Sequence, residues 1–158
     1  MGSTTQDADL QAACTISGQL DIDDGDFDTN NNAVTVTGAA IIYNGGEFDC
    51  SGDSANHDIG GRLEIQNGGL FNAGSASGDV TIGALTLISG GTFTGAAGSK
   101  LIIDSEYSNF AADLEGTYTS NSNTMEIKTN ANTEVDLKDD KVYNLITVSY
   151  THLRAHET

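Results

Sequence analysis

Apolar and polar residues alternate in short runs along most of the chain. Leu20-Asp21-Ile22, Val34-Thr35-Val36 and Val80-Thr81-Ile82 are examples. A period of two is the pattern of a half-buried β-strand. Gly, Asn and Asp stand between the runs, where they favour tight turns. The pattern therefore predicts an all-β chain of many short strands joined by sharp corners.

A phrase of two glycines followed by an aromatic residue recurs along the sequence. The clearest copy, Asn67-Gly68-Gly69-Leu70-Phe71-Asn72, returns with changes at residues 44–49 and 89–94. The aromatic positions recur roughly every 22 residues, at Phe27, Phe48, Phe71, Phe93 and Tyr118. A fixed period of this size is typical of stacked repeats.

Alignment on this period brings the apolar positions into three columns. The first is Ile16, Val36, Ile59, Ile82, Ile103, Ile127, the second is Leu20, Ala40, Leu63, Leu85, and the third is Ile22, Ile42, Ile65, Leu87. Strands with one or two apolar residues cannot bury them alone, so each coil must lie on the next. We therefore predict a single-stranded right-handed parallel β-helix (β-solenoid) of about six coils of roughly 22 residues.

The predicted organisation is one solenoid domain over residues 13–148. Residues 1–12 lack the period and are predicted to be a disordered lead-in. The repeat loosens at residues 106–114, where we expect a side loop or a widened coil in place of a second strand. Val135-Asp136-Leu137 then restores that strand.

The charge of the chain narrows the classes of partner. Six Lys and Arg against 23 Asp and Glu give a formal net charge of −17. This balance argues against nucleic acid and anionic membrane surfaces as partners. No apolar run reaches the length of a membrane span, so we expect no membrane insertion.

Two cysteines, Cys14 and Cys50, allow at most one disulfide. Cys14 falls on an inward position of the first strand, which suits a small buried apolar residue. A bridge between the two cysteines is compatible with the sequence, and spacing does not decide it.

Catalytic residues are difficult to place. His57 follows Cys50 in a polar stretch and precedes Asp58, so a thiol, a base and an orienting carboxylate can be imagined. Nothing at this spacing is a known signature, and a polar loop histidine is the favoured interpretation. We therefore predict no enzyme activity.

Clustered carboxylates raise the question of a calcium site, because hard cations take oxygen ligands. Asp21, Asp23, Asp24 and Asp26 are the candidate metal ligands. Neither an EF-hand loop nor the tandem GGxGxD repeat of calcium-binding β-rolls occurs. Alternation along a strand places Asp21 and Asp23 on one outer face and Asp24 at a corner. The alternative is an acidic surface that contacts only solvent. We therefore predict no cofactor and name Ca²⁺ as the candidate ion.

The repeats ISGQLDIDDGDFD, IIYNGGEFD, LEIQNGGLFNAGSASGDVTI and LTLISGGTFTGAAGSKLII resemble those of bacterial surface and adhesin-like proteins with right-handed β-helix folds. The segment 116–148 is similar to a module of long secreted or surface-anchored bacterial proteins, in which an aromatic-Asn-Leu phrase begins a strand, here Tyr143-Asn144-Leu145. The resemblance implies an extracellular or cell-surface location and a scaffold, adhesive or spacer role. It carries over no catalytic residue.

The last residues, SYTHLRAHET (149–158), resemble the adapter-derived tails of sequences predicted from metagenomic assemblies. They share neither the period nor the composition of the solenoid, so a non-native tail is predicted, with a native capping segment as the alternative. A solenoid cut from a longer one exposes open rungs, and we expect end-to-end self-association through uncapped coils.

Two functions follow from the sequence. The first is a non-catalytic structural or adhesive segment that binds a cell-surface ligand or a polysaccharide at most. The alternative is a polysaccharide-binding or polysaccharide-degrading β-helix protein, a lyase or glycoside hydrolase, because such enzymes share this fold and use carboxylates. Basic residues outside the tail are Arg62, Lys100, Lys128, Lys138 and Lys141, and they fall in different coils. Fold alone supplies no active site.

Overall fold

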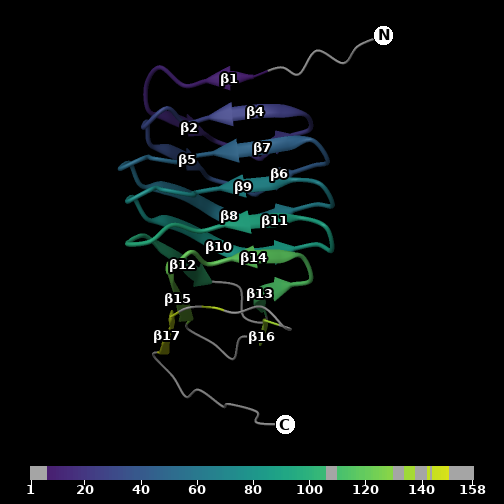
Figure 1. Ribbon diagram of the computed structural model, residues 1–158, viewed down its shortest axis with the longest axis vertical. Coiled ribbons are helices and arrows are strands. Elements are labelled where there is room, and N and C mark those ends of the chain that lie inside the picture. The colour runs from purple at the N-terminus through teal and green to yellow at the C-terminus, as the bar shows by residue number, and fades with distance from the viewer. Residues whose placement is uncertain (1–6, 106–109, 130–133, 138–141, 143, 150–158) are drawn as a thin grey trace.

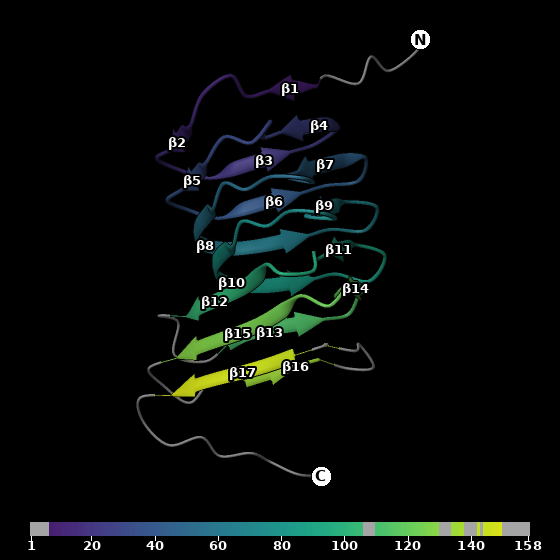
Figure 2. The same cartoon turned by 60° about the vertical axis from the view of Figure 1, so that its left-hand side comes forward.

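The computed structural model shows a parallel β-solenoid of about six turns, whose rungs are piled along the long axis (Figures 1 and 2). The structure describes residues 7–105, 110–129, 134–137, 142 and 144–149. Within these ranges no residue is helical, and no helix is long and apolar enough to cross a membrane. The predicted tail lies outside the described residues from 150 onward.

Each coil runs along three sides. The first side is formed by β2 (Cys14–Ile16), β5 (Val34–Val36), β12 (Lys100–Ser105), β15 (Thr124–Thr129) and β17 (Asn144–Ser149). The second is formed by β3 (Leu20–Ile22), β6 (Ala40–Ile42), β13 (Phe110–Leu114) and β16 (Glu134–Asp136). In two coils these sides join into one strand, β8 (His57–Ile65) and β10 (Val80–Leu87). The third is formed by β1 (Ala8–Asp9), β4 (Gly25–Asp28), β7 (Gly46–Asp49), β9 (Leu70–Asn72), β11 (Thr92–Thr94) and β14 (Thr117–Thr119).

All strand pairs are parallel and join consecutive coils. The third side is a 6-stranded sheet, and the first two sides share an 11-stranded sheet. The predicted first column is confirmed, because Ile16 pairs with Val36 and the register then continues through Ile59 and Ile82 to Ile127. The second and third columns are confirmed in the same way and extend to Ala112 and Leu114.

A bulge lets β8 and β10 turn between the first two sides. The register between them shifts between Ile82 and Ala84, which leaves Gly60 and Gly61 against Gly83. A Cβ on Gly83 would lie 2.6 Å from the carbonyl oxygen of Gly60. Glycine is therefore needed here, because the backbones of adjacent coils approach too closely for a side chain.

The corner after the third side repeats one turn in every coil. A backbone N–H bonds the carbonyl three residues earlier in the turns 29–32, 50–53, 73–76, 96–99 and 120–123. In three coils the residue that ends the third strand also accepts a bond from the N–H two residues later. These residues are Asp28, Asp49 and Asn72. Such side chains favour tight turns, which explains the Asp and Asn content of the repeats.

The aromatic column (Phe27, Phe48, Phe71, Phe93, Tyr118) fills the side of the core next to the third sheet. Ring centroids of Phe48 and Phe71 are 4.9 Å apart, those of Phe71 and Phe93 are 5.0 Å apart, and the planes of the second pair differ by only 2°. The spacing is close to the roughly 4.8 Å between paired strands. The backbone ladder therefore sets the stacking distance of the rings.

Two expectations about the ends of the repeat were wrong. Residues 8–9, within the predicted disordered lead-in, form β1, and Ala8 pairs with Phe27, the first ring of the aromatic column. Where a loop or widened coil was expected in place of the second strand at 106–114, residues 110–114 form that strand, since β13 pairs with β10 with Ala112 opposite Leu85, while residues 106–109 lie outside the described residues. Ala112 is buried in the second column, where Leu63 and Leu85 are larger and Ala40 is equally small.

Replacing Phe71 with alanine should lower the free energy of unfolding by about 3–5 kcal/mol, because a fully buried ring between two stacked neighbours leaves a cavity. Phe27→Ala should cost clearly less, because Phe27 is only partly buried in the first coil. Urea denaturation followed by circular dichroism measures both. Equal losses would contradict the stacked-core account.

Candidate functional site

A group of buried polar side chains lies at the corner where β7 leads into β8. Its members are Thr29, Cys50, Asp53 and His57, and all four are buried. Thr29 directly follows β4, and His57 is the first residue of β8. Cys50 and Asp53 are the first and last residues of the equivalent turn one coil after Thr29. We call these four residues the corner cluster.

Asp53 connects three consecutive coils. Its Oδ2 accepts a hydrogen bond from Thr29 Oγ1, and its Oδ1 accepts one of 2.8 Å from the backbone N–H of Asn31. Its carbonyl oxygen accepts a 2.7 Å bond from the N–H of Ser77 in the following coil. A buried carboxylate requires such partners, since an unpaired one would be strongly unfavourable.

His57 occupies a core position, and its predicted place in a polar loop was wrong. It is the first residue of β8 and pairs with Val80 of β10, and the residue is only 2% exposed. Its ring meets the ring of Phe48 edge to face, with centroids 5.9 Å apart. The same inward position holds Cys14, Val34, Val80, Leu101 and Met125 in other coils. A histidine therefore replaces an aliphatic residue in one rung.

Asp53 is the carboxylate beside His57. His57 Nε2 lies 3.4 Å from Asp53 Oδ2, but within the described residues neither ring nitrogen makes a hydrogen bond. Burial lowers the pKa of His57, and the nearby Asp53 carboxylate partly opposes this shift. Asp58, the carboxylate of the imagined triad, is exposed on the outer face and pairs with Thr35 and Thr81.

Cys50 is a buried thiol. Burial raises its pKa strongly, and the carboxylates of Asp53 and Asp49 raise it further. A neutral thiol is a poor nucleophile and a poor metal ligand. Cys14 and Cys50 are both free, so they form no bridge. The corner cluster therefore contains the residue types of a catalytic triad in a place that a substrate does not reach.

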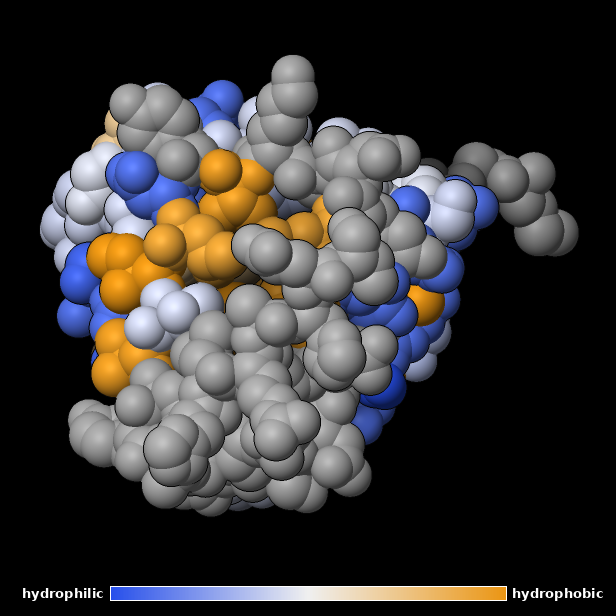
Figure 3. All heavy atoms as spheres, turned by 90° about the horizontal axis from the view of Figure 1, so that it is seen from below, coloured by the Kyte–Doolittle hydropathy of each residue, from blue (hydrophilic) through white to orange (hydrophobic). Residues whose placement is uncertain are grey.

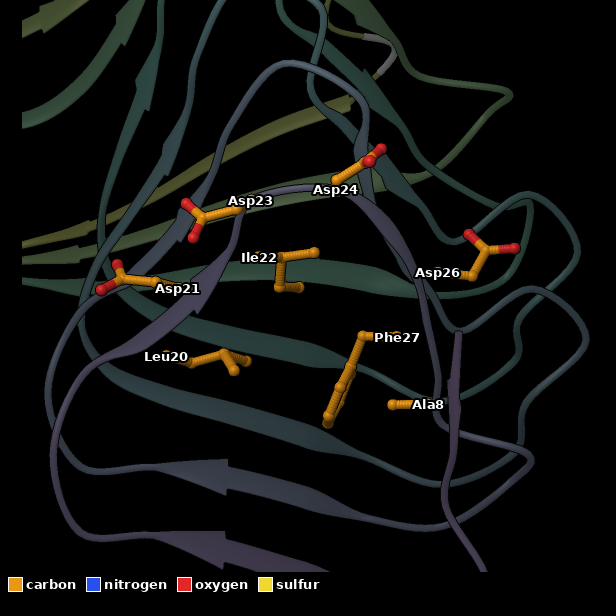
Figure 4. Close-up of a pocket in the computed structure, with 8 residues that line it drawn as sticks. All are labelled: Ala8, Leu20, Asp21, Ile22, Asp23, Asp24, Asp26 and Phe27. Carbon is orange, nitrogen blue, oxygen red and sulfur yellow. The ribbon is translucent and has the colours of Figure 1, made fainter. Parts of the chain in front are cut away.

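The candidate calcium ligands do not converge. Asp21, Asp23, Asp24 and Asp26 line a cavity of about 370 Å³ at the N-terminal end of the solenoid, together with Leu20, Ile22, Phe27 and Ala8. Figure 4 shows the four carboxylates spread around the rung, while the apolar side chains point into its centre. Within the described part of the chain, no three His, Cys, Asp or Glu side chains gather closely enough to hold a metal ion.

Desolvation raises the pKa of Asp26, and the Asp49 carboxylate adds to the shift. Asp26 pairs with Glu47 on the next rung, and Glu47 in turn accepts a 3.0 Å bond from Asn72 Nδ2. Stacking thus brings carboxylates of successive coils side by side. Like charges in this position repel, so this outer row stores unfavourable electrostatic energy.

A second cavity, of about 570 Å³, opens on the outer face over the bulge. Its floor includes Gly60 and Gly83, and Asp58, Thr81 and Asp104 stand around it. The strand register places Asp58 and Asp104 two coils and two residues apart, a Cα separation of about 12 Å from standard strand spacings. The lining contains two carboxylates and a hydroxyl, and neither an aromatic nor a basic side chain.

The basic side chains of the described coils lie next to glutamates. Arg62 forms an ion pair with Glu64, while Lys100 and Lys128 lie 3.0 Å and 3.8 Å from Glu126. The bond from Lys100 lowers the pKa of Glu126. These exposed pairs contribute little stability, but they leave the three cations dispersed rather than gathered. Lys138 and Lys141 lie outside the described residues.

Sequence reasoning missed Asp53, and a signal for it was present. Asp53 stands three residues after Cys50, as Asn32 stands three after Thr29 and Asn123 three after Ser120. Aligning the corners, and not only the strands, would have identified an inward polar position. Asn123 uses it to accept a 2.7 Å bond from the Tyr118 hydroxyl.

The fold defines the class of the protein as a parallel β-solenoid. Comparison of the chain with protein-family models, with curated proteins and with solved structures gave no match.

The contribution of His57 to stability should fall as the pH drops below about 6.5, because the folded state holds His57 with a lowered pKa. Between the folded and unfolded pKa values the unfolded chain binds more protons. The loss should approach at most about 1.4 kcal/mol for each pH unit. His57→Leu should flatten this dependence between pH 7.5 and pH 5.5, measured by urea denaturation. An unchanged slope in the variant would contradict the assignment.

Cys50 should resist thiol reagents in the folded protein, because it is fully buried and its pKa is raised. Cys14, which is only partly buried in the first coil, should react well before Cys50. Counting modified thiols by mass spectrometry, with Cys14→Ser as the control, distinguishes them. Rapid labelling of Cys50 in that variant would show that the corner opens readily.

Proposed function

We propose that this chain is a non-catalytic structural or adhesive segment of a bacterial extracellular or cell-surface protein. The observation that carries the proposal is the unbroken register of the aromatic column and of the three aliphatic columns. These columns couple every coil to the next, and the resemblance of the repeats to those of bacterial surface proteins supplies the setting.

A stack of this kind suits a stiff spacer. Each coil of about 22 residues advances the axis by only one strand spacing, about 4.8 Å. Consecutive coils share backbone ladders on three sides, so bending would break hydrogen bonds on one of them. Each short step along the axis uses a whole coil, so the solenoid is wide and stiff but short for its number of residues.

The outer surface suits a well-solvated rod. The net charge is −17, and exposed outward positions such as Asp21, Asp23 and Asp58 carry carboxylates. A high charge of one sign keeps such a rod soluble and separates it from other anionic surfaces. Any ligand recognised by a face would have to be cationic or rich in hydroxyl groups.

The groups with catalytic chemistry support this proposal over an enzyme. The corner cluster is buried, and burial keeps its thiol protonated. Asp58 and Asp104 stand on the outer face two coils apart, and the cavity that they line contains neither an aromatic nor a basic side chain. The cations that a uronate substrate would need are dispersed and next to glutamates.

The second candidate is a polysaccharide-binding protein. It is favoured by the cavity over the bulge, where Asp58, Thr81 and Asp104 offer hydrogen-bonding groups around a floor of glycine backbone.

The two candidates are distinguished by incubating the chain with a panel of neutral and uronate polysaccharides. We expect no new reducing ends, no unsaturated uronate products and no retention on the immobilised glycans. Binding that falls in the double variant Asp58→Asn, Asp104→Asn, and not in the charge-matched Asp23→Asn, Asp113→Asn, would establish the second candidate. Product formation would overturn the non-catalytic proposal.

A further inference from the structure

The imidazole of His57 is an exception in the described core. Among the described residues, the buried side-chain atoms without a hydrogen bond are its two ring nitrogens. They lie in the interior of the rod, where hydrophobic residues gather within a largely hydrophilic border when the molecule is seen along its long axis (Figure 3). Buried polar atoms in proteins are almost always hydrogen-bonded, so this exception requires a physical reason.

The Asp53 carboxylate lies across a short gap from this ring. His57 Nε2 is 3.4 Å from Asp53 Oδ2, and no hydrogen bond joins them. The imidazolium carries a hydrogen on both nitrogens, so protonation makes Nε2 a donor toward this oxygen. Hydrogen bonds between charged groups are shorter and about twice as strong as those between neutral groups. A movement of about 0.6 Å brings the two atoms to the usual separation of such a bond.

The oxygen that faces His57 already has a partner. Thr29 Oγ1 donates a hydrogen bond to Asp53 Oδ2, whereas Asp53 Oδ1 accepts the backbone N–H of Asn31. Thr29 and His57 belong to different coils, and both address the same carboxylate oxygen. An imidazolium at position 57 therefore competes directly with the Thr29 hydroxyl.

The Thr29 hydroxyl has a second acceptor within reach. Its Oγ1 lies 3.1 Å from the carbonyl oxygen of Asp49, which also accepts the backbone N–H of Thr29 at 3.0 Å. A carbonyl oxygen has two lone pairs, so it accepts both donors. A hydroxyl has one hydrogen to donate, and it is shared between the two acceptors. Thr29 can thus release Asp53 without leaving its own hydroxyl unpaired in the core.

The strands packed around His57 present apolar groups to it. Val34 of β5 and Val80 of β10 occupy the equivalent inward position in the two adjacent coils. The Phe48 ring of β7 meets the imidazole edge to face. None of these three side chains competes for a proton.

The other titratable groups of the surrounding elements are neutral or turned elsewhere. Cys50 is buried in the same turn, and the Asp49 carboxylate helps to raise its pKa, so the thiol stays neutral. Asp58 lies on the outer face of β8. Asp79 accepts the backbone N–H of position 57 with its carbonyl oxygen, while its carboxylate accepts the backbone N–H of Lys100.

We propose that the corner cluster is a pH-sensitive hydrogen-bond switch, in which protonated His57 takes Asp53 Oδ2 and the Thr29 hydroxyl turns to the Asp49 carbonyl. The imidazole gains one proton from solvent, and no covalent bond of the chain changes. At neutral pH the neutral ring leaves Oδ2 to Thr29. At acid pH an ion pair replaces the bond between the hydroxyl and the carboxylate.

The pH range of the switch follows from the burial of the ring. Desolvation lowers the pKa of His57, and the Asp53 carboxylate partly opposes this shift. The exchange therefore takes place below the ordinary value of about 6.5. Because both states keep every hydroxyl and carboxylate of the cluster paired, the corner changes partners without opening.

The test is an NMR titration of the full chain between pH 7.5 and pH 4.5. Long-range proton–nitrogen spectra report the protonation of the His57 ring, and His57→Leu identifies its signals. We expect a reversible titration in the folded protein with a midpoint below about 6.5. The side-chain carboxyl carbon of Asp53 and the carbonyl carbon of Asp49 should shift with the same midpoint. Loss of the folded signals before the ring titrates would overturn the proposal.

Thr29→Val removes the competing hydroxyl and keeps the shape of the side chain. It should raise the His57 midpoint by about one pH unit, because Asp53 Oδ2 is then free to pair with the imidazolium. It should also abolish the shift of the Asp49 carbonyl carbon. Thr35→Val, the same change at an exposed position, should alter neither. An unchanged midpoint in Thr29→Val, or equal shifts in both variants, would contradict the competition.

Asp53→Asn provides a second measurement that does not depend on Thr29. The amide has no charge, so the His57 midpoint should fall by at least about one pH unit. Circular dichroism establishes that each variant is folded. A ring that titrates in Asp53→Asn as it does in the unaltered chain would show that the carboxylate is not its partner, and the switch would be excluded.

Discussion

The parallel backbone ladder between successive coils is the interaction on which the rest of the structure depends. It fixes the distance between rungs, and every side chain then meets its equivalent one coil away. The ladder therefore turns a sequence repeat into continuous columns, stacks the rings of Phe48, Phe71 and Phe93 about one strand spacing apart, and brings Asp26 beside Glu47. Favourable and unfavourable neighbours arise from the same constraint.

The columns were predictable because a solenoid is nearly one-dimensional. Ile16, Val36 and Ile59 are neighbours in space simply because they occupy equivalent positions in the repeat, so alignment of the strands was sufficient. The strand at 110–114 was missed because its buried residues Ala111 and Ala112 are small and adjacent, which hides the alternation of apolar and polar positions. At this strand the length of the repeat was a more reliable predictor of structure than the alternation of apolar and polar residues.

The corner cluster was harder to predict, because it depends on residues that differ between coils. His57 replaces an aliphatic residue in a core column, and a polar residue in a polar stretch gives no periodic signal. Its partner Asp53 lies in a turn whose equivalents include Ala76, Ser99 and Asn123. Proximity in sequence favoured Asp58, but strand alternation sends that side chain to the opposite face. A local departure from the repeat becomes visible only once the coils are stacked.

The three-coil reach of Asp53 has a consequence for how the molecule comes apart. Coils at either end of a solenoid can detach singly, since each contacts only its neighbours. If the coil that carries Thr29 and Asn31 detached, however, the buried Asp53 carboxylate would lose these two hydrogen-bond donors. The free-energy cost of the unpaired carboxylate would then destabilise the coil that remains. Unfolding from the N-terminus therefore meets an additional free-energy cost at that coil.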